Sequence, residues 1–465
     1  MPQQPAHTIL SHCASALGLT DQVVERLSVT GSGNLPSCFP VTDLAVASIG
    51  AAGLSLADLM AALGQTVRVE VDRRLASLWF DFTIAPQGWA LPHAWDPIAG
   101  DYPARDGWIK LHTNSPHHKK AALSVLACAP ERDAVASAVA GVLAQDLETA
   151  IVAAGGCAAT LRSHSDWQDH PQGRAVIAEP LVHWGEASGD SPSEWRPAMD
   201  RPLAGLRVLD LTRILAGPVA TRFLAGFGAE VLRIDPPDWD EPAVVPDVTL
   251  GKRCARLDLR RQLDREVFEQ LLSEADVLVH GYRRDALEAM GLGAAARQTI
   301  RPGLIDVSLN AYGHSGPWAN RRGFDSLVQL SSGIAAAGMA WRLSDRPVSL
   351  PVQALDHATG YLMAAAVIRG LRARLSDSKL RKARLSLART AELLFVARGE
   401  ATATDFPPAA RTDFASNPEI TPWGSARRLK PPLQMSNCAM HWDRPAQKLG
   451  STVARWNKRD LGKSV

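Results

Sequence analysis

The sequence of 465 residues predicts an α/β protein with a doubly wound parallel sheet. In the second half, short apolar runs alternate with segments of helical period. The predicted strands and helices are, in order, 206–211, 217–227, 230–234, 265–274, 277–279, 285–290 and 304–307. Strands that alternate with helices build a parallel sheet covered by helices on both faces. We therefore expect a Rossmann-like domain, accompanied by a smaller α+β domain.

The first half of the chain predicts that smaller unit. Residues 41–63 are rich in Ala, Leu and Ile with few charges, which is typical of a buried helix. Residues 67–72 alternate between apolar and polar side chains, as a half-buried strand does. The remaining predicted elements are a loop over 89–102, a strand over 108–111 and a helix over 134–154.

Shifts in composition predict where the units meet. Residues 185–202 are rich in Gly, Ser and Pro and predict a linker. After Ser376 the chain is basic and then Pro-rich, without clear periodicity. The predicted units are an N-terminal segment (1–40), a smaller half (41–184), the linker (185–202), the sheet-containing domain (203–370), and a linker helix with an irregular C-terminal tail (371–465).

A weak internal echo connects the halves. Pro40 precedes an Ala-rich helical segment and then residues 69–80, and Pro351 precedes a similar pair of segments, with offsets that drift from 311 to 315 residues. Two Ala-rich helices also share such a pattern by chance, so duplication and coincidence both stay open.

The charge is unevenly distributed. The net charge is +2, with −8 over residues 1–201 and +10 over residues 202–465. Opposite charges suggest that the halves attract each other and that the basic half holds an anion. Because no Lys/Arg run is interleaved with aromatic residues, we expect no nucleic acid as a partner, and a small polyphosphate is the simpler anion.

Several protein classes are excluded. No apolar run approaches the ~20 residues of a membrane helix, so we expect no membrane partner. The first residues form no basic segment followed by an apolar one, so we expect no signal peptide. The six cysteines form no CxxC pair and no His/Cys group has metal-ligand spacing, so we expect no metal and a reduced, cytoplasmic environment.

Candidate anion-binding residues follow the predicted strands. The turn after the strand 206–211 lacks GxGxxG, which argues against a bound dinucleotide, but a helix N-terminus there can receive a phosphate. Arg213 and Arg233 follow neighbouring strands, at the edge where open α/β sheets bind ligands. The alternative is that both are solvated or ion-paired surface residues.

Two further basic segments are candidates. Lys252 and Arg253 follow Gly251 and suit phosphate clamping, although a charged strand edge gives the same pattern. Tyr282 and Arg283 follow the strand 277–279 and suit sandwiching of a nucleotide base, although a turn with a half-buried Tyr is the plainer interpretation.

Asp325 is the candidate for chemistry. It follows a polar loop and precedes an apolar run, so it either caps a helix or acts as a nucleophile at a helix N-terminus. His314 lies in a Gly-flanked turn and is interpreted as a loop histidine. No GxSxG, HExxH or Walker A motif competes with Asp325.

Taken in order, these segments resemble the class III CoA-transferase family, which includes formyl-CoA transferase, carnitine CoA-transferase and α-methylacyl-CoA racemase. The matching segments are 205–213, 216–218, 228–231, 251–253, 257–259, 275–279, 291–293, 312–317, 323–325 with Gln329 and Gly333, and Asp356 with Thr359 and Gly360. Their order and spacing over residues 203–370 carry the resemblance.

The first half resembles the smaller C-terminal domain of the same family. Residues 102–109, 155–158 and 170–172 carry this likeness, and here they precede the CoA-binding part. The inverted order puts the family's interlocked dimer in question: the first half completes the second either within one chain or across a dimer. The resemblance implies a homodimer.

The resemblance implies roles for single residues. Asp325 matches the catalytic aspartate, whose carboxylate attacks an acyl-CoA and gives a mixed anhydride, then an aspartyl-CoA thioester. Arg213, Arg233, Lys252, Arg253, Tyr282 and Arg283 fall at positions that resemble the CoA groove. CoA or acyl-CoA is then a substrate, a small carboxylic acid is the acceptor, and no cofactor is tightly bound.

Two further implications concern the loops. Backbone N–H groups near Gly313, Gly316 or Gly333 are candidate oxyanion donors. Residues 333–341 are apolar where such transferases carry a Gly-rich loop that shields the intermediate, so residues 89–95 of the first half are expected to shield it instead.

Two alternatives to transfer stay open. Racemisation of a 2-methylacyl-CoA needs a His partner upstream of the aspartate, and only His314 lies between Tyr282 and Asp325. A CoA-binding protein without catalysis is the other alternative. The sequence does not specify the acyl donor or the acceptor.

Overall fold

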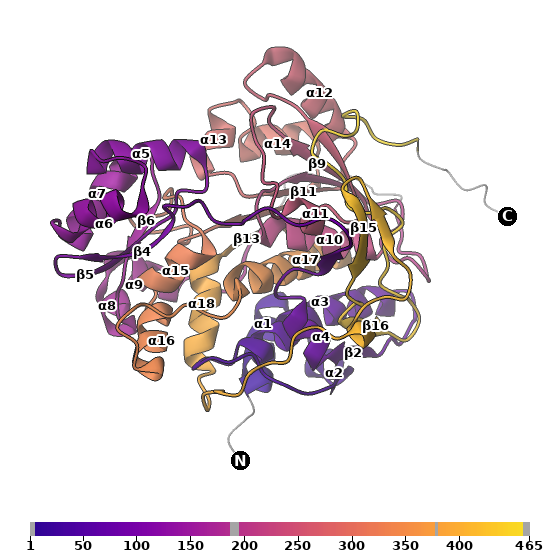
Figure 1. The fold of residues 1–465 in the computed structure, drawn as a ribbon. Coiled ribbons are helices and arrows are strands. Elements are labelled where there is room, and N and C mark those ends of the chain that lie inside the picture. Colours follow the sequence, from indigo (N-terminus) through magenta and orange to yellow (C-terminus); the bar gives the residue numbers. More distant parts are fainter. Residues whose placement is uncertain (1–4, 187–194, 377–379, 459–465) are drawn as a thin grey trace.

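A computed structural model describes residues 5–186, 195–376 and 380–458, and its largest sheet has seven strands (Figure 1). The strand order is β10-β9-β8-β11-β12-β13-β7. Neighbours pair in parallel except β7, which runs antiparallel to β13. The six parallel strands, taken along the chain, have the order 3-2-1-4-5-6 of a doubly wound Rossmann-like sheet. The predicted fold class is confirmed.

Four strands of this sheet, β8, β9, β11 and β12, follow predicted segments, whereas β7, β10 and β13 were not predicted as strands. The strands are β7 (His183–Glu186), β8 (Arg207–Leu211), β9 (Glu230–Asp235), β10 (Lys252–Arg256), β11 (Val277–His280), β12 (Ile305–Asn310) and β13 (Leu380–Ser386).

Alternate side chains of the central strands face opposite layers. Val208 and Val277 pack into the core that contains α10 and α17, whereas Leu209 and Leu278 pack against α12. Both faces are therefore buried, as the apolar runs predict. The helices of this half are α10 (Ala216–Gly226), α11 (Val245–Val248), α12 (Gln262–Ser273), α13 (Arg284–Glu288), α14 (Ala294–Ile300), α15 (Asp325–Ser331), α16 (Ile334–Arg342), α17 (Ala354–Leu375) and α18 (Leu387–Val396).

The first half contributes helices and six short strands to the smaller sheets. β4, β5 and β6 form an antiparallel sheet beside α5–α7, which appears as a separate lobe in Figure 1. The predicted helix over 134–154 is two helices, because the chain turns between α6 and α7. The elements are α1 (Pro5–Leu17), α2 (Asp21–Val24), β1 (Leu27–Thr30), α3 (Val41–Ala61), β2 (Val69–Asp72), α4 (Arg73–Leu78), β3 (Ile84–Pro86), β4 (Gly100–Ala104), β5 (Gly107–Leu111), α5 (Pro116–Leu126), α6 (Arg132–Ala140), α7 (Ala144–Ala153), β6 (Ala158–Thr160), α8 (His164–Asp169) and α9 (Pro171–Ala178).

The C-terminal region is more regular than the sequence predicts. β13 and α18 lie beyond residue 370 and belong to the main sheet domain, so the predicted range 203–370 is too short. β14 (Glu419–Thr421), β15 (Gly424–Arg428) and β16 (Leu433–Met435) follow, with a 3-10 turn at Arg411–Asp413. Strands of three to five residues between prolines leave no readable periodicity, which explains the error.

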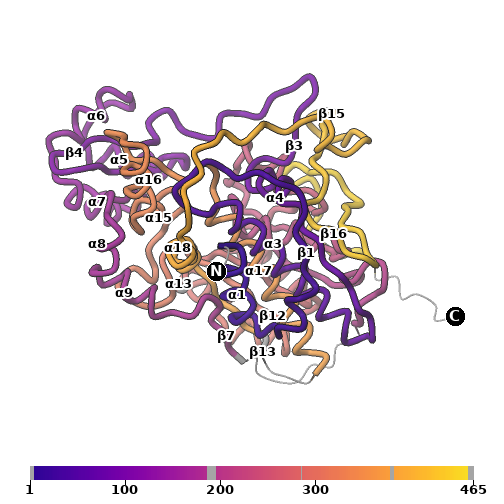
Figure 2. Tube along the Cα trace, turned by 90° about the horizontal axis from the view of Figure 1, so that it is seen from below, coloured from indigo at the N-terminus to yellow at the C-terminus, as the bar shows by residue number. Residues whose placement is uncertain are grey.

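These late strands pair with the first half. β15 pairs with β3 and β16 pairs with β2, so residues 424–435 lie along residues 69–86 (Figure 2). The predicted linker 185–202 begins inside β7, and its residues 187–194 lie outside the described residues. The two halves thus form interleaved layers and do not follow the predicted boundaries.

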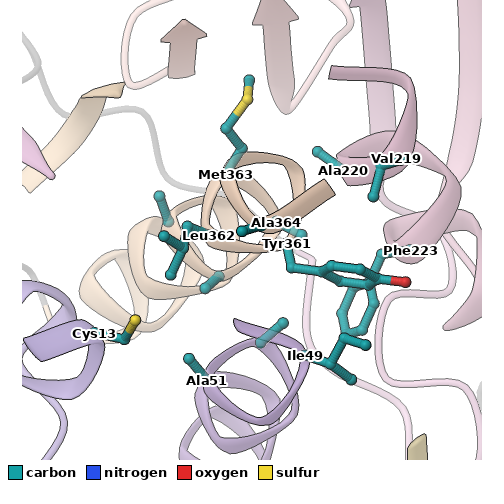
Figure 3. Packing of buried hydrophobic residues seen from close by; sticks show 14 of the residues in the cluster. Cys13, Ile49, Ala51, Val219, Ala220, Phe223, Tyr361, Leu362, Met363 and Ala364 are labelled. Atoms are coloured by element: carbon teal, nitrogen blue, oxygen red, sulfur yellow. The ribbon is translucent and has the colours of Figure 1, made fainter. Parts of the chain in front are cut away.

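Helices α3 and α17 lie at the centre of the core (Figure 3). Figure 3 shows Ile49 of α3 and Phe223 of α10 against Tyr361 of α17. The residues that precede the two long helices, Pro40 and Gln353, share the dihedral angles φ −77° and ψ 64°. Each helix is followed by a strand and a helix, β2–α4 and β13–α18. The echo in the sequence is thus a repeated helix–strand–helix unit.

Helix α3 has the length and hydropathy of a membrane span. Its 21 residues include an 18-residue window of mean hydropathy 1.7, so the sequence-based statement that no run approaches ~20 residues is wrong for this segment. In the fold 89% of that window is buried, as in the core helix of a globular protein.

Candidate active site

A cavity of about 800 Å³ lies at the carboxyl ends of β8, β9, β10 and β11. This edge is where open parallel sheets bind ligands, and the volume falls in the range of small-molecule sites. The second half contributes Arg213, Trp239, Tyr282, Asp325 and Asp356, among others. Residues 93–96 and 112–117 of the first half complete the lining. The two halves of a single chain therefore build one cavity together.

Asp325 lies in this cavity as the first residue of α15. Its carboxylate accepts three hydrogen bonds, which hold it in place. Oδ1 accepts from Gln329, one turn along the same helix, and Oδ2 accepts from the backbone N–H groups of Leu355 (2.8 Å) and Asp356 (3.0 Å). The two N–H groups belong to the first turn of α17, whose helix dipole favours an anion.

Burial governs the protonation of the acidic pair in the cavity. It raises the pKa of Asp325 to about 6, and the three hydrogen bonds oppose the rise. Burial, and then the negative charge of Asp325, raise the pKa of Asp356 well above its usual range. At neutral pH Asp325 is thus an ionised, oriented carboxylate, as a nucleophile must be.

An aromatic wall from both halves lies next to Asp325. Phe324 stacks on His112 with ring centroids 3.7 Å apart, and Trp95 meets His112 edge-on. Burial lowers the pKa of His112 to about 3, so its imidazole is neutral. In the part of the chain that the structure describes, His112 Nδ1 and Ser326 Oγ are buried without a hydrogen-bond partner. Buried polar atoms are normally bonded, so these atoms are available to a ligand.

Arg213 and Tyr282 lie in the cavity, as predicted for ligand-binding residues. Arg213 Nη2 donates to the Tyr282 hydroxyl at 3.0 Å. The guanidinium also lies over the rings of Trp239 (4.7 Å) and Tyr282 (5.3 Å). A cation flanked by two aromatic faces suits a phosphate or a heteroaromatic ring. Arg283 is exposed and lies outside the cavity lining.

The other predicted groove residues do not line the cavity. Arg233 is fully buried against Asp235 and Glu241, and Lys252 Nζ lies 3.0 Å from Asp210 Oδ2. Arg253 pairs with Glu230 and donates to the Arg455 carbonyl at 2.7 Å. All three side chains point from strands into the packed layers, where each neutralises an acidic group. The sequence shows that a basic residue follows a strand, but it does not show which acidic side chain pairs with that residue in the fold.

Arg233 nevertheless supports the cavity through Glu241. Glu241 Oε2 accepts from the backbone N–H of Ile214 at 2.8 Å and from Trp239 Nε1 at 3.1 Å. Ile214 has φ +63°, which is strained for a β-branched residue. The buried Arg233–Glu241 pair therefore fixes a strained turn and an aromatic side chain of the cavity wall.

The loop that precedes Asp325 is fixed by the first half. Gln172 Nε2 donates to the carbonyls of Tyr312 (2.7 Å) and Ser315 (2.8 Å), and Glu179 accepts from the backbone N–H of Ser315 (2.7 Å). Gly316 has φ +78°, and a Cβ there would lie 2.7 Å from the Ala175 Cβ. The glycine motif at this position thus makes room for α9.

The glycines expected to donate to an oxyanion have other functions. Gly313 N donates to Asn310 Oδ1 at 2.8 Å, and a Cβ on Gly333 would lie 2.3 Å from the His164 backbone N. Neither these glycines nor Gly316 lines the cavity. Residues 333–341 form mainly α16, and His93 and Trp95 of the first half lie in the cavity, as expected for the alternative shield.

The structure also reveals site residues that the sequence reasoning missed. The sequence indicates Asp356 only as part of a segment that matches the family. Nothing in the sequence around Trp239, His112 and His117 indicates a place in the site beyond the residue type itself. Among the described residues no cluster of three His, Cys, Asp or Glu side chains suits a metal ion.

Comparison with known proteins agrees with this geometry. Residues 203–421 match the model of the family described as CoA-transferase family III. The chain is 31% identical over 214 residues to the human succinyl-CoA:glutarate CoA-transferase, covering 42% of this chain and 48% of that protein. It is 35% identical over 200 residues to an acetyl-coenzyme A transferase of Hypoxylon pulicicidum, covering 40% of this chain and 33% of that one.

Solved structures show the same partial likeness. A crystal structure of Rv3272 from Mycobacterium tuberculosis is 30% identical with a TM-score of 0.38, covering 42% of this chain and 57% of that one. A Brucella suis protein described as a CAIB/BAIF family member is 26% identical with a TM-score of 0.38, covering 49% and 65%. The chain spans less than half the length of these curated relatives. Residues 203–421, which include Asp325, thus match CoA-transferase family III.

Proposed function

We propose that this protein transfers CoA from an acyl-CoA to a carboxylic acid, with Asp325 as the nucleophile. The Asp325 carboxylate attacks the thioester carbonyl, the C–S bond breaks, and CoA thiolate leaves a mixed anhydride. The thiolate then attacks the aspartyl carbonyl, which releases the first acid and leaves an aspartyl-CoA thioester. The acceptor carboxylate attacks that thioester, the C–S bond breaks, and CoA thiolate leaves a second mixed anhydride. The thiolate then attacks the acceptor's acyl carbonyl, which forms the new acyl-CoA and releases the Asp325 carboxylate.

One observation carries the proposal: a buried carboxyl group, held by three donors, lies in a cavity built at the carboxyl ends of parallel strands. A carboxylate suits this chemistry because its anhydride and thioester are both activated acyl groups and no proton must first be removed. The Arg213–Tyr282–Trp239 group offers a cation between aromatic faces for the CoA moiety.

The test traps the covalent intermediate. The protein is incubated with short, branched and aromatic acyl-CoAs, quenched with hydroxylamine, and digested for peptide mass mapping. We expect a hydroxamate on the peptide that carries Asp325, absent in Asp325→Ala and present in Asp345→Ala. Asp345 is a matched control because its carboxyl is exposed after α16, outside the cavity. An unmodified Asp325 in a protein that binds CoA would contradict the proposal.

One observation favours racemisation as a second candidate. The sequence offered only His314 as a proton-transfer partner, and that side chain is bonded to the Leu385 carbonyl, outside the cavity. The first half instead places His117 in the lining, with Nδ1 2.7 Å from Ser115 Oγ, and burial lowers its pKa. A neutral imidazole there would face the same substrate as Asp325. Exchange of the α-proton of a 2-methylacyl-CoA in D₂O, without a hydroxamate on Asp325, would support this candidate.

The homodimer and the cytoplasmic location expected from the sequence stay predictions. A non-catalytic CoA-binding protein is the outcome in which CoA binds but neither the hydroxamate nor the proton exchange is found.

A further inference from the structure

The reaction cavity contains two buried carboxyl groups that are connected through the backbone. Asp356 lies in the first turn of α17, and its N–H donates to Asp325 Oδ2 at 3.0 Å. The backbone N–H of Ala216, where α10 begins, opposes the rise in the pKa of the Asp356 carboxyl. Asp325 is 1% exposed and Asp356 is 7% exposed, and both line the cavity. Each is a potential anion at the point where an acyl group would react.

No cation neutralises this pair. Within the described ranges, neither carboxyl has a Lys or Arg nitrogen at ion-pair distance. The other titratable or charged groups that line the cavity are His93, Asp96, His112 and His117 of the first half, Arg213 after β8, Asp238, Asp240 and Glu241 after β9, Asp258 and Arg260 after β10, and Tyr282 after β11. Arg260 is paired with Asp258 at 2.7 Å. Arg213 is held by Tyr282 and Trp239, and Glu241 is paired with Arg233. Two buried carboxylates without a cation are costly, so one proton stays on the pair.

The hydrogen bonds decide which group keeps that proton. Asp325 accepts from three donors, two of them N–H groups of a helix N-terminus, whereas only the N–H of Ala216 acts on the Asp356 carboxyl within the described residues. Donors to a carboxylate stabilise its charged form. The negative charge therefore resides on Asp325 and the proton on Asp356, in agreement with the charge of Asp325, which adds to burial in raising the pKa of Asp356.

The repeated helix–strand–helix unit supplies an internal comparison. Asp43 in α3 and Asp356 in α17 are each the third residue after the position with φ −77° and ψ 64°. Asp43 pairs with Arg73 at 2.7 Å, the first residue of the helix that ends its unit. The first residue of the equivalent helix α18 is Leu387. Asp43, away from the cavity, is thus paired with a guanidinium, whereas the equivalent helix position in the unit of Asp356 carries the apolar Leu387.

We propose that Asp356 is a positioning residue of the reaction centre, kept protonated beside Asp325 so that the pair bears a single negative charge. The inference rests on the proposed nucleophilic role of Asp325. Attack by Asp325 on a thioester moves negative charge onto the carbonyl oxygen, and a second carboxylate nearby would repel that charge. Ionisation of Asp356 therefore slows the attack, and its protonated form permits it.

The test is the pH profile of Asp325 acylation, measured in single turnover with an acyl-CoA that gives the hydroxamate. In the parent we expect the rate to fall below about pH 6, where Asp325 is protonated, and to fall again at alkaline pH, where Asp356 ionises. Asp356→Asn keeps a neutral group of the same shape. We expect it to retain the acid limb, to lose the alkaline fall, and to stay within about tenfold of the parent at neutral pH, short of the ~10²-fold loss typical of a missing acid–base group.

Asp43→Asn is the matched control, because it removes the equivalent carboxyl outside the cavity, and its profile should equal the parent's. Asp356→Ser, whose hydroxyl also accepts from an N–H group, replaces the Asn variant if the latter does not fold. A folded Asp356 variant that is inactive at every pH would show that the carboxylate is required and overturn the inference. An alkaline fall in the acylation rate that is the same in the parent and in the Asp356 variant would also overturn the inference. No acylation of the parent by any acyl-CoA would instead contradict the proposed function itself.

Discussion

Arg213 differs from the other predicted cations because, among the described residues, it lines the cavity and they do not, and it lies there between two aromatic rings. We expect Arg213→Met to weaken CoA binding by about tenfold or more, since a cation–π contact and a charge-assisted hydrogen bond are lost together. Isothermal titration with CoA measures the effect. Arg253→Met is the control, because Arg253 contacts Glu230 and the C-terminal chain. Equal losses in both variants would contradict the assignment.

Glu392 is a buried carboxyl whose protonation affects the stability of the fold. Burial raises its pKa from 4.5 to about 7, against the hydrogen bond from Trp167 Nε1 at 3.2 Å. The unfolded chain loses this proton at lower pH than the folded chain, so the parent loses stability as the pH rises from about 4.5 to about 7.

Glu392→Gln keeps an acceptor for Trp167 and removes the titration. We expect equal stability at pH 4 and a gain of at most about 3 kcal/mol for the variant at pH 8. Urea unfolding at both pH values measures the difference. Glu400→Gln, in an exposed segment, should show none, and a gain for Glu392→Gln that is independent of pH would show that the carboxyl is not protonated in the fold.

Sequence reasoning at the residue scale was most informative where a residue type and its local setting jointly define the chemistry. Asp325, at a helix start after a Gly-containing loop, lies where it was expected. Arg233 and Lys252 follow the same kind of pattern but meet Glu241 and Asp210 inside the protein. The partner of a buried charge comes from a distant strand, which no local spacing reveals.

Glycines at the contact between elements determine how the first half docks on the loop and helix around Asp325. Gly333 has φ +92° and lies against the start of α8, where a Cβ would be 2.3 Å from the His164 N. We expect Gly333→Ala to cost about 2 kcal/mol or more, because both backbone strain and displacement of α8 contribute. Denaturant unfolding tests this.

The chain offers a matched control for that substitution. Gly88 also has a positive φ of +79°, but a Cβ there meets nothing within 4 Å. Gly88→Ala isolates the strain and should cost about 1 kcal/mol or less. If the two variants lose equal stability, the close approach of α8 makes no contribution.

Elements long enough to show the apolar repeat of a helix or a strand were predictable from the sequence, and shorter elements were not. The alternating strands and helices of the second half and the apolar helix α3 carry their own pattern over many residues. β14, β15 and β16 are three to five residues long and exist because β2 and β3 supply partners from the far end of the chain. Pairing that depends on residues more than 300 positions away has no local signature.

At the scale of the whole molecule, the first half of the chain supplies one wall of the cavity around Asp325. The inverted order of the two halves leaves open whether that wall comes from the same chain or from a second one. Residues 93–96 and 112–117 reach the cavity of Asp325, and ion pairs such as Glu148–Arg321 fasten the acidic half to the basic half. The opposite net charges of the halves are consistent with this contact. In this structure the two halves of one chain thus build the cavity together.

This arrangement predicts the outcome of a complementation experiment. Asp325→Ala removes the nucleophile from the second half, and His112→Glu places a carboxylate against Phe324 on the wall from the first half. We expect each variant to be inactive in the acylation assay. Because every site takes both parts from one chain, mixing the two variants, or unfolding and refolding them together, should restore no activity. The specific activity of the parent should likewise stay constant on dilution, measured over the range in which light scattering shows any dimer to dissociate. Recovery of activity in the mixture would mean that the first half of one chain completes the cavity of another, as in an interlocked dimer.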